Sequence, residues 1–511
     1  MSTFPAPQLP PAYPARAPWG TADKLRAWQH EALEAYRSAQ PRDFLAVATP
    51  GAGKTTFALR VAADLLRHRV IRGLTVVAPT EHLKRQWADA AHKAGVSIDP
   101  DFRNSAGVTS ADFAGIAVTY AGVAARPALH RARTQSRPTL VILDEIHHAG
   151  DALSWGEAVQ EAFEPATRRL ALTGTPFRSD TNPIPFVTYL RDGSGALRSA
   201  ADYSYGYGHA LRDGVVRPVI FLSYSGRMRW RTRVGEEVSA TLGAPMSQDA
   251  LAQAWRTALD PAGEWVPQVL AAAHRRLTGV RRSVPDAAGL VIASDQAAAR
   301  AYARLLHQVS GERPTVVVSD EPDASLRIER FAGSDQRWMV AVRMVSEGVD
   351  VPRLAVGVYA TSASTPLFFA QAVGRFVRAR RRGETASLFL PSIPALLEHA
   401  AELEAERDHV LERPSGGDEL LDGLDAGVVD SPPSAQEGPG EQPPLAFQAL
   451  ESEAAFDRVL YDGGEFGTTA AVGSPEEEDY LGLPGLLEPH QVAALLRRRQ
   501  AGQRAAERRR A

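Results

Sequence analysis

Residues 44–56 constrain this 511-residue chain more than any other stretch, because a short apolar run leads directly into a glycine-rich loop. The loop carries Gly51 and Gly53, and Lys54 and Thr55 follow it where a helical pattern begins. This order matches a phosphate-binding loop in which alanine stands in place of the usual first glycine. Glycines let backbone N–H groups approach phosphate oxygens, and the N-terminus of the next helix attracts the same negative charge.

The side chains of this loop suit a nucleoside triphosphate. Lys54 can supply a positive charge to the β- and γ-phosphates, and the Thr55 hydroxyl can be a ligand for Mg²⁺. The alternative is an ordinary glycine-rich turn that happens to precede Lys-Thr. The motif predicts an ATP site made of Pro50, Gly51, Ala52, Gly53, Lys54, Thr55 and Thr56.

The composition is that of a water-soluble globular protein, with 44% hydrophobic and 23% charged residues. The chain has no run of eighteen apolar residues, so we expect no membrane-spanning helix, and a cytoplasmic ATP-using protein is the default expectation. Cysteine is absent, which excludes disulfides and thiolate metal sites. The net charge of −3 hides an asymmetry, because residues 414–480 are acidic and the remainder is net basic.

Short apolar segments alternate with helical patterns twice along the chain. The first set comprises residues 44–48, 74–78, 116–119, 140–143 and 170–173, and the second comprises 289–293, 315–318, 338–343, 354–360 and 386–390. Continuous apolar strands separated by helices indicate parallel sheets covered on both faces. The sequence therefore predicts two α/β units, of which only the first has a phosphate-binding loop.

The predicted division of the chain has five parts. They are a disordered leader (1–20), a first α/β domain (21–190), a connection or small insertion (191–285), a second α/β domain (286–395) and a C-terminal tail (396–511). The tail contains an acidic linker (414–480) and a basic terminal helix (488–511). That helix can bind phosphates, dock on the acidic segment, or simply be solvated.

A second decisive motif is the apolar run 140–143, which ends in Asp144 and Glu145. Two carboxylates at the tip of a strand beside a phosphate-binding loop are placed for different tasks. Asp144 can hold Mg²⁺ directly or through water, and Glu145 can polarise the attacking water as a general base. The alternative is a pair of exposed acids that close a strand.

At this point the sequence resembles a family. Residues 144–147, Asp-Glu-Ile-His, are similar to the DExH box of superfamily 2 helicases and translocases, and further motifs follow in the family's order. Residues 172–178 (Leu-Thr-Gly-Thr-Pro-Phe-Arg) resemble motif III of the restriction-enzyme-motor-like branch. Residues 346–352 look like motif V, 371–378 look like motif VI, and 25–29 resemble the adenine-reading Gln motif. The resemblance spans about residues 25–390.

The resemblance implies two tandem RecA-like parallel-sheet domains, with ATP and Mg²⁺ in a cleft between them. It assigns catalytic roles to Glu145, Gln371, Arg375 and Arg378, with the two arginines at a helix start reaching ATP from the second unit. It also implies roles in ATP binding for Arg26, Gln29 and Asp350, in coupling for His147, Thr173 and Thr175, and in nucleic-acid binding for Pro79, Thr80, Thr119, Arg178 and Arg343.

The resemblance favours an ATP-dependent DNA helicase or duplex translocase, whose partner is DNA. Two alternatives stay open: an RNA helicase or remodelling enzyme, and a non-processive, ATP-switched nucleic-acid-binding subunit of a restriction, repair or defence complex. A protein partner bound through the C-terminal tail is a further expectation.

Overall fold

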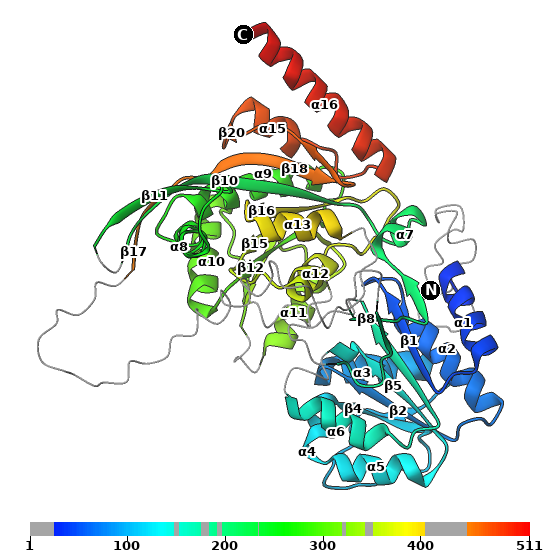
Figure 1. Cartoon of the computed structure of the whole chain (residues 1–511). Coiled ribbons are helices and arrows are strands. Elements are labelled where there is room, and N and C mark those ends of the chain that lie inside the picture. Colours follow the sequence, from blue (N-terminus) through cyan, green and yellow to red (C-terminus); the bar gives the residue numbers. More distant parts are fainter. Residues whose placement is uncertain are drawn as a thin grey trace, which may run out of the picture. The chain divides into compact units, whose positions relative to one another are not determined.

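The structure, a computed structural model, describes residues 25–147, 153–174, 183–191, 197–232, 235–318, 323–342, 351–403 and 447–510. The chain divides into two compact units, with a boundary between Val216 and Arg217 (Figure 1). The predicted leader, residues 1–20, lies outside the described residues. Among the described residues, no helix combines the length and the apolar character needed to cross a membrane.

Unit 1 is built on a seven-stranded sheet in the order β3-β4-β2-β5-β6-β1-β9, in which all the paired strands are parallel. Its strands are β1 (Asp43–Ala48), β2 (Gly73–Ala78), β3 (Ile98–Asp99), β4 (Gly115–Thr119), β5 (Thr139–Asp144), β6 (Arg168–Thr173) and β9 (Tyr203–Tyr205), and β7 (Tyr189–Arg191) pairs separately with β8 (Leu197–Ser199). All five strands predicted for the first unit are confirmed. Strands β2 and β5 are buried along their whole length, as their continuous apolar sequences require.

The helices of unit 1 are α1 (Ala27–Ala39), α2 (Lys54–Arg67), α3 (Glu81–Lys93), α4 (Tyr120–Ala125), α5 (Pro127–Ser136), α6 (Leu153–Phe163) and α7 (Tyr207–Arg212). Helices α2, α3 and α4 each begin directly or within a few residues after a strand of the sheet. Their N-termini therefore lie at the carboxyl edge of the sheet, the edge where open α/β sheets bind ligands.

Unit 2 is built on a larger sheet with the path β13-β14-β12-β15-β16-β10-β18-β19. Its strands are β10 (Val219–Arg231), β11 (Glu237–Leu242), β12 (Ala288–Ala293), β13 (Thr315–Val317), β14 (Trp338–Val342), β15 (Leu354–Ala360), β16 (Ala386–Pro391), β17 (Gln448–Ser452), β18 (Ala455–Tyr461), β19 (Gly464–Phe466) and β20 (Ala470–Ala471). The pairs from β13 to β10 are parallel, and β18 joins β10 antiparallel. The five strands predicted for the second unit correspond to β12–β16.

The helices of unit 2 are α8 (Gln248–Ala258), α9 (Trp265–Arg281), α10 (Gln296–Ser310), α11 (Ala324–Ala332), α12 (Pro366–Gly374), α13 (Pro394–Glu402), α15 (Pro475–Leu481) and α16 (Pro489–Arg510). Both units are thus α/β structures: the sheet of unit 1 is parallel, and the sheet of unit 2 is a parallel set extended by antiparallel strands. Two such units in tandem agree with the predicted pair of RecA-like domains.

Residues 191–285 were predicted to connect the two domains, but in the structure they contribute strands to both sheets. Strand β9 belongs to the sheet of unit 1, whereas β10 is an inner strand of the sheet of unit 2 and pairs with β16. Beyond residue 225 the sequence alternates Arg227, Met228, Arg229, Trp230, with the arginines exposed and the apolar side chains buried. A period of two indicates a strand, so the basic cluster there is the outer face of β10.

The second half of the predicted acidic linker is also not a linker in the structure. Residues 447–480 include β17, β18 and most of α15, and β18 pairs with β10 from Phe221 to Ser225. Because this stretch is acidic, it was predicted as a linker, but it contains a strand in which Phe456, Val459 and Leu460 are buried. The physical reason is that acidic side chains occupy exposed or paired positions while the apolar ones extend the core of the sheet.

Buried Arg276 attaches this C-terminal part to unit 2. Its guanidinium donates to the Ser387 hydroxyl at 2.9 Å and to the carbonyls of Leu481 and Leu483, at the C-terminal end of α15. Burial, together with the nearby charge of Arg499, lowers the pKa of Arg276 to about 10. The cation therefore meets the negative end of a helix dipole.

Candidate nucleotide-binding site

The predicted phosphate-binding loop joins β1 to α2 at the carboxyl edge of the unit 1 sheet. Gly51 and Gly53 have φ angles of +78° and +96°, in the left-handed region that favours glycine. Gly53 is the N-cap of α2, so Lys54, Thr55 and Thr56 lie in its first turn. The free N–H groups of a helix start are thereby presented where an anion can bind.

Three side chains from the start of α1 bind the carbonyls of this loop. Arg26 donates to the carbonyls of Gly51 and Ala52 at 3.1 and 2.6 Å, and the indole of Trp28 donates to Ala52 O at 3.1 Å. Gln29 donates from Nε2 to Gly53 O at 2.8 Å, and its Oε1 accepts from the Arg26 N–H at 2.7 Å. The structure therefore places Arg26 and Gln29, both predicted to bind ATP, directly against the loop.

Lys54 connects the loop to the motif at the end of β5. Its Nζ lies 2.9 Å from Glu145 Oε1 and donates to the Ala48 carbonyl at 3.1 Å. The other carboxylate oxygen of Glu145 accepts from the Gly174 N–H at 3.0 Å, just after β6. Two of the residues predicted from separate motifs are thus in direct contact, although β6 lies between β1 and β5 in the sheet.

Glu145 is held in an ionised state and in a constrained backbone conformation. Burial by itself would raise its pKa, but the charges of Lys54 and His147 and the hydrogen bonds from Lys54 and Gly174 outweigh burial and lower the pKa to about 2. Its φ of +47° lies in the left-handed region, which costs a residue with a side chain about 1–2 kcal/mol. Glu145 is therefore ionised at neutral pH and, while Lys54 is paired with it, is a weak proton acceptor.

Asp144, the last residue of β5, is oriented by two aromatic side chains. The indole N–H of Trp87 donates to Asp144 Oδ2 at 2.6 Å, and the Tyr120 hydroxyl donates to its backbone carbonyl at 2.9 Å. A carboxylate and the Thr55 hydroxyl are oxygen donors of the type that Mg²⁺ prefers. Among the described residues, no cluster of three or more acidic or imidazole side chains could hold a metal ion unaided. The donor set therefore fits an ion that is shared with the phosphates of a nucleotide.

His147 and Thr173, predicted to couple nucleotide state to the rest of the protein, are in contact. His147 Nδ1 lies 3.0 Å from the Thr173 hydroxyl and 3.7 Å from Glu145 Oε2, and both His147 and Thr173 are buried. The third coupling residue, Thr175, lies outside the described residues.

The residues predicted to bind nucleic acid are only partly described. Thr80 caps α3 by accepting from the Leu83 N–H at 3.3 Å, and Thr119 caps α4 by accepting from the Gly122 N–H at 3.0 Å. With Pro79, they follow or end the neighbouring strands β2 and β4 at the carboxyl edge of the sheet. Arg178 and Arg343 lie outside the described residues.

In unit 2, the predicted catalytic residues follow one another around the end of α12. Gln371 lies within the helix, Arg375 is its C-cap, and Arg378 lies beyond it, so the arginines are at a helix end and not at a helix start. Asp350, the predicted ribose contact, is outside the described residues.

The segment between the two arginines is fixed by Arg217, which the sequence analysis did not identify. Its backbone N–H donates to Val377 O at 2.8 Å, and its Nε donates to Phe376 O at 2.6 Å. Its Nη1 also lies 3.4 Å from Glu384, and both side chains are buried. The sequence carries no signal for this role, because it depends on carbonyls that lie about 160 residues further along the chain.

The sequence analysis also missed the hydrogen bonds made by the side chains of Trp28, Trp87 and Tyr120. The hydrogen-bonding group of each side chain contacts a residue 24 to 57 positions away in the chain. Periodicity finds the apolar ring of such a residue and does not show where its N–H or O–H points.

Comparison with known proteins agrees with this fold. A protein-family model described as "Type III restriction enzyme, res subunit" matches residues 22–178. A fragment of a putative HsdR subunit of a type I restriction enzyme from Vibrio vulnificus YJ016 has the same fold, with a TM-score of 0.51 and 18% identity, over 75% of this chain and 67% of that one. Residues 22–178 are therefore similar to the helicase-like part of restriction enzymes, and the fold over three quarters of the chain is that of the HsdR fragment.

Two mycobacterial proteins, each described as an uncharacterized protein, are similar over most of the chain. The Mycobacterium tuberculosis protein is 60% identical over 478 residues, which are 93% of this chain and 78% of the relative. The Mycobacterium leprae protein is 56% identical over 476 residues, 93% of this chain and 79% of the relative. The chain belongs to the family of these mycobacterial proteins.

Proposed function

We propose that this protein is an ATP-dependent DNA helicase or duplex DNA translocase. The observation that supports this most is the contact between Lys54 and Glu145, because it joins the phosphate-binding loop to the general-base candidate. Trp87 and Tyr120 orient the neighbouring Asp144, and His147 connects the same strand end to Thr173. Together these residues form the half-site that unit 1 contributes to hydrolysis.

In the proposed reaction, the phosphates of ATP compete with Glu145 for Lys54. The Nζ of Lys54 leaves Glu145 and Ala48 O for the β- and γ-phosphates, and the freed carboxylate of Glu145 polarises the attacking water. Mg²⁺, held by Thr55 and Asp144, would neutralise charge on the phosphate oxygens. The pKa of Glu145 rises when Lys54 departs, which makes the carboxylate a better proton acceptor.

Residues of unit 2 would stabilise the transition state. Arg378, with Arg375, would stabilise the charge that develops on the γ-phosphate, and Gln371 would help to place the water. Asp350 would bind the ribose. Hydrolysis would then depend on closure of the two units, and His147 with Thr173 and Thr175 would report the nucleotide state.

Movement along nucleic acid would depend on contacts with its phosphates. Pro79, Thr80 and Thr119 would contact phosphates at the carboxyl edge of the first sheet, with Arg178 and Arg343 as further contacts. Such contacts carry little base information, so they suit a motor that moves along any sequence. We favour DNA because residues 172–178 and 347–352 resemble the DNA-translocating branch.

The test is the ATPase rate of the full chain against single-stranded, duplex and forked DNA and RNA. We expect stimulation by DNA, abolished in Lys54→Ala and Glu145→Gln. Strand-displacement and triplex-displacement assays then separate a helicase from a duplex translocase. Stimulation by RNA alone would favour the remodelling enzyme, and ATP-dependent binding without displacement would favour the switch. ATP turnover that survives both substitutions contradicts the motor.

A further inference from the structure

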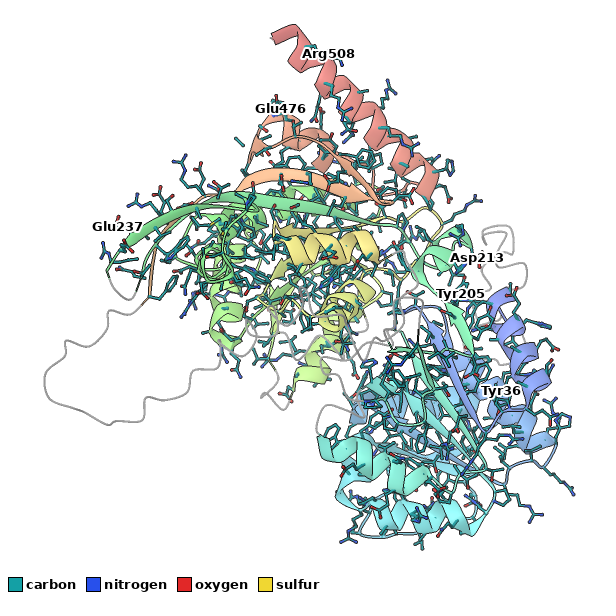
Figure 2. All side chains as sticks on the ribbon, in the orientation of Figure 1. Tyr36, Tyr205, Asp213, Glu237, Glu476 and Arg508 are labelled. Atoms are coloured by element: carbon teal, nitrogen blue, oxygen red, sulfur yellow. The ribbon has the colours of Figure 1, made fainter. Side chains whose placement is uncertain are left out.

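Helix α16 has one face packed against unit 2 and one face covered with arginine. Val492, Leu496 and Gln503 are buried, and Gln503 Oε1 accepts from the Tyr480 hydroxyl at 3.0 Å. Figure 1 shows α16 beside α15, and Figure 2 shows Arg508 near its far end. The helix is therefore anchored on unit 2, and its opposite face is available to a partner.

The exposed arginines of α16 follow the helix period. Arg497, Arg504 and Arg508 are separated by seven and four residues, so they lie on one stripe, and Arg498 flanks it. At 1.5 Å per residue, the stripe spans about 16 Å along the helix axis. Three guanidinium groups at this spacing form a linear positive surface.

Three other exposed arginines of unit 2 lie beside carboxylates. Arg229 pairs with Glu451 at 3.0 Å, Arg458 with Glu465 at 2.8 Å, and Arg382 with Glu488 at 2.7 Å. For the four arginines of α16 named above, the described part of the chain supplies no carboxylate at ion-pairing distance. Their charge is therefore not neutralised within the folded unit that the structure describes.

Three acidic residues near the start of α16 pair with other partners. Glu477 is fully buried, accepts from the Tyr224 hydroxyl at 2.6 Å and lies 2.7 Å from Arg275. Glu478 pairs with the same arginine at 2.6 Å, and Glu488 pairs with Arg382. These three carboxylates therefore neutralise cations other than the arginine stripe.

We propose that the arginine stripe, Arg497, Arg504 and Arg508 with Arg498, binds the phosphate backbone of a nucleic acid, independently of base sequence. Guanidinium groups bind phosphate oxygens in a bidentate manner and are weakly hydrated, so they suit a row of phosphates. This proposal deepens the proposed function and rests on it in one respect, namely that nucleic acid is the track. It adds a contact outside the sheet edge where motor contacts are expected.

The test compares two triple variants of the full chain with the same change in net charge. Arg497→Gln/Arg504→Gln/Arg508→Gln removes the stripe, and Arg229→Gln/Arg382→Gln/Arg458→Gln removes three paired arginines of the same unit. Binding of a labelled DNA duplex is measured by fluorescence anisotropy over a series of salt concentrations. Three lost phosphate contacts should reduce the slope of log K against log salt by about 2.7, while the control slope stays unchanged.

The outcomes separate this proposal from the motor. Thermal melting curves check that both variants fold, and ATPase without nucleic acid should be the same as in the wild type. The stripe variant can show the expected slope change while DNA does not stimulate the ATPase of the wild type. In that case the proposed motor function is wrong and the proposed phosphate contact of the stripe is supported. Equal slopes in the wild type and the stripe variant, or equal losses in both variants, overturn the stripe. Unchanged DNA binding with faster proteolysis of residues 404–446 also overturns it, because the stripe then holds this acidic segment of the same chain.

Discussion

Replacement of Trp87 by phenylalanine should weaken the use of Mg²⁺ much more than it weakens folding. The indole N–H donates to Asp144 Oδ2 at 2.6 Å, and both side chains are buried. Phenylalanine retains an aromatic ring in the same core position but has no donor. The carboxylate that we propose as a metal ligand would therefore lose the group that orients it.

The size of the effect follows from the kind of hydrogen bond. A hydrogen bond to a charged group contributes about 1.5–3 kcal/mol, and about 1.4 kcal/mol corresponds to a tenfold change in an equilibrium constant. We expect the Mg²⁺ concentration at half-maximal ATPase rate to rise by about 10- to 100-fold, the range found when groups behind metal ligands are removed. The rate at saturating Mg²⁺ should change less, because Glu145 and Lys54 are intact.

The assay is the ATPase rate at fixed ATP, measured as free Mg²⁺ is titrated. Trp265→Phe is the matched control, because its buried indole donates to Ser225 O at 2.9 Å in unit 2. Both variants should lose a similar amount of stability, and only Trp87→Phe should shift the Mg²⁺ midpoint. An unshifted midpoint in Trp87→Phe would refute the reasoning, since Trp87 would then contribute packing alone.

Three further predictions concern single residues. Gln29→Ala should lower kcat/KM for ATP and for GTP by the same factor, because both halves of the amide bind the protein at 2.7 and 2.8 Å; a loss confined to ATP in steady-state assays would show base reading instead. Glu145 has a pKa lowered from 4.5 to about 2, so its ionised form stabilises the fold above pH 4.5, and this stabilisation disappears as pH falls through 2. The difference in Tm between wild type and Glu145→Gln should therefore be largest near neutral pH and shrink below pH 4.5, and a difference independent of pH would contradict this. Arg276→Met should cost about 3 kcal/mol in urea unfolding, because buried carbonyls lose their donors, whereas Arg458→Met should cost far less.

The parallel strands of both units could be predicted because each is a continuous apolar run between helical patterns. Strand β10 lies within the stretch predicted as a connection or small insertion (191–285), and its segment from Arg227 to Trp230 is rich in arginine. Strand β18 was hidden by acidic neighbours. Both errors have one cause: a strand at the edge of the parallel set is buried less evenly, so charge dominates its composition while its apolar positions still complete a core.

In the candidate site, too, some contacts could be predicted from the sequence and others could not. The contact of Lys54 with Glu145 could be anticipated, because both residue types are required by chemistry at the carboxyl edge of one sheet. The donors from Arg26 and Trp28 to the loop carbonyls could not, because no motif spacing encodes a hydrogen bond between a helix start and a loop 24 to 26 residues away. The same holds for Arg217, whose role is visible only from the carbonyls it binds.

The contacts of α1 explain why the loop needs a support as well as glycines. A phosphate-binding loop directs its N–H groups toward the ligand, so several of its carbonyls point the other way and need donors of their own. Arg26, Trp28 and Gln29 supply those donors, and the loop is thereby ordered before any phosphate binds. Gly53 is fixed twice over, by a φ of +96° and because a Cβ atom there would lie 2.8 Å from Gln29 Nε2. The Gln29 amide and the glycine therefore constrain each other, and this mutual constraint favours Gln29 as a positioning residue of the loop.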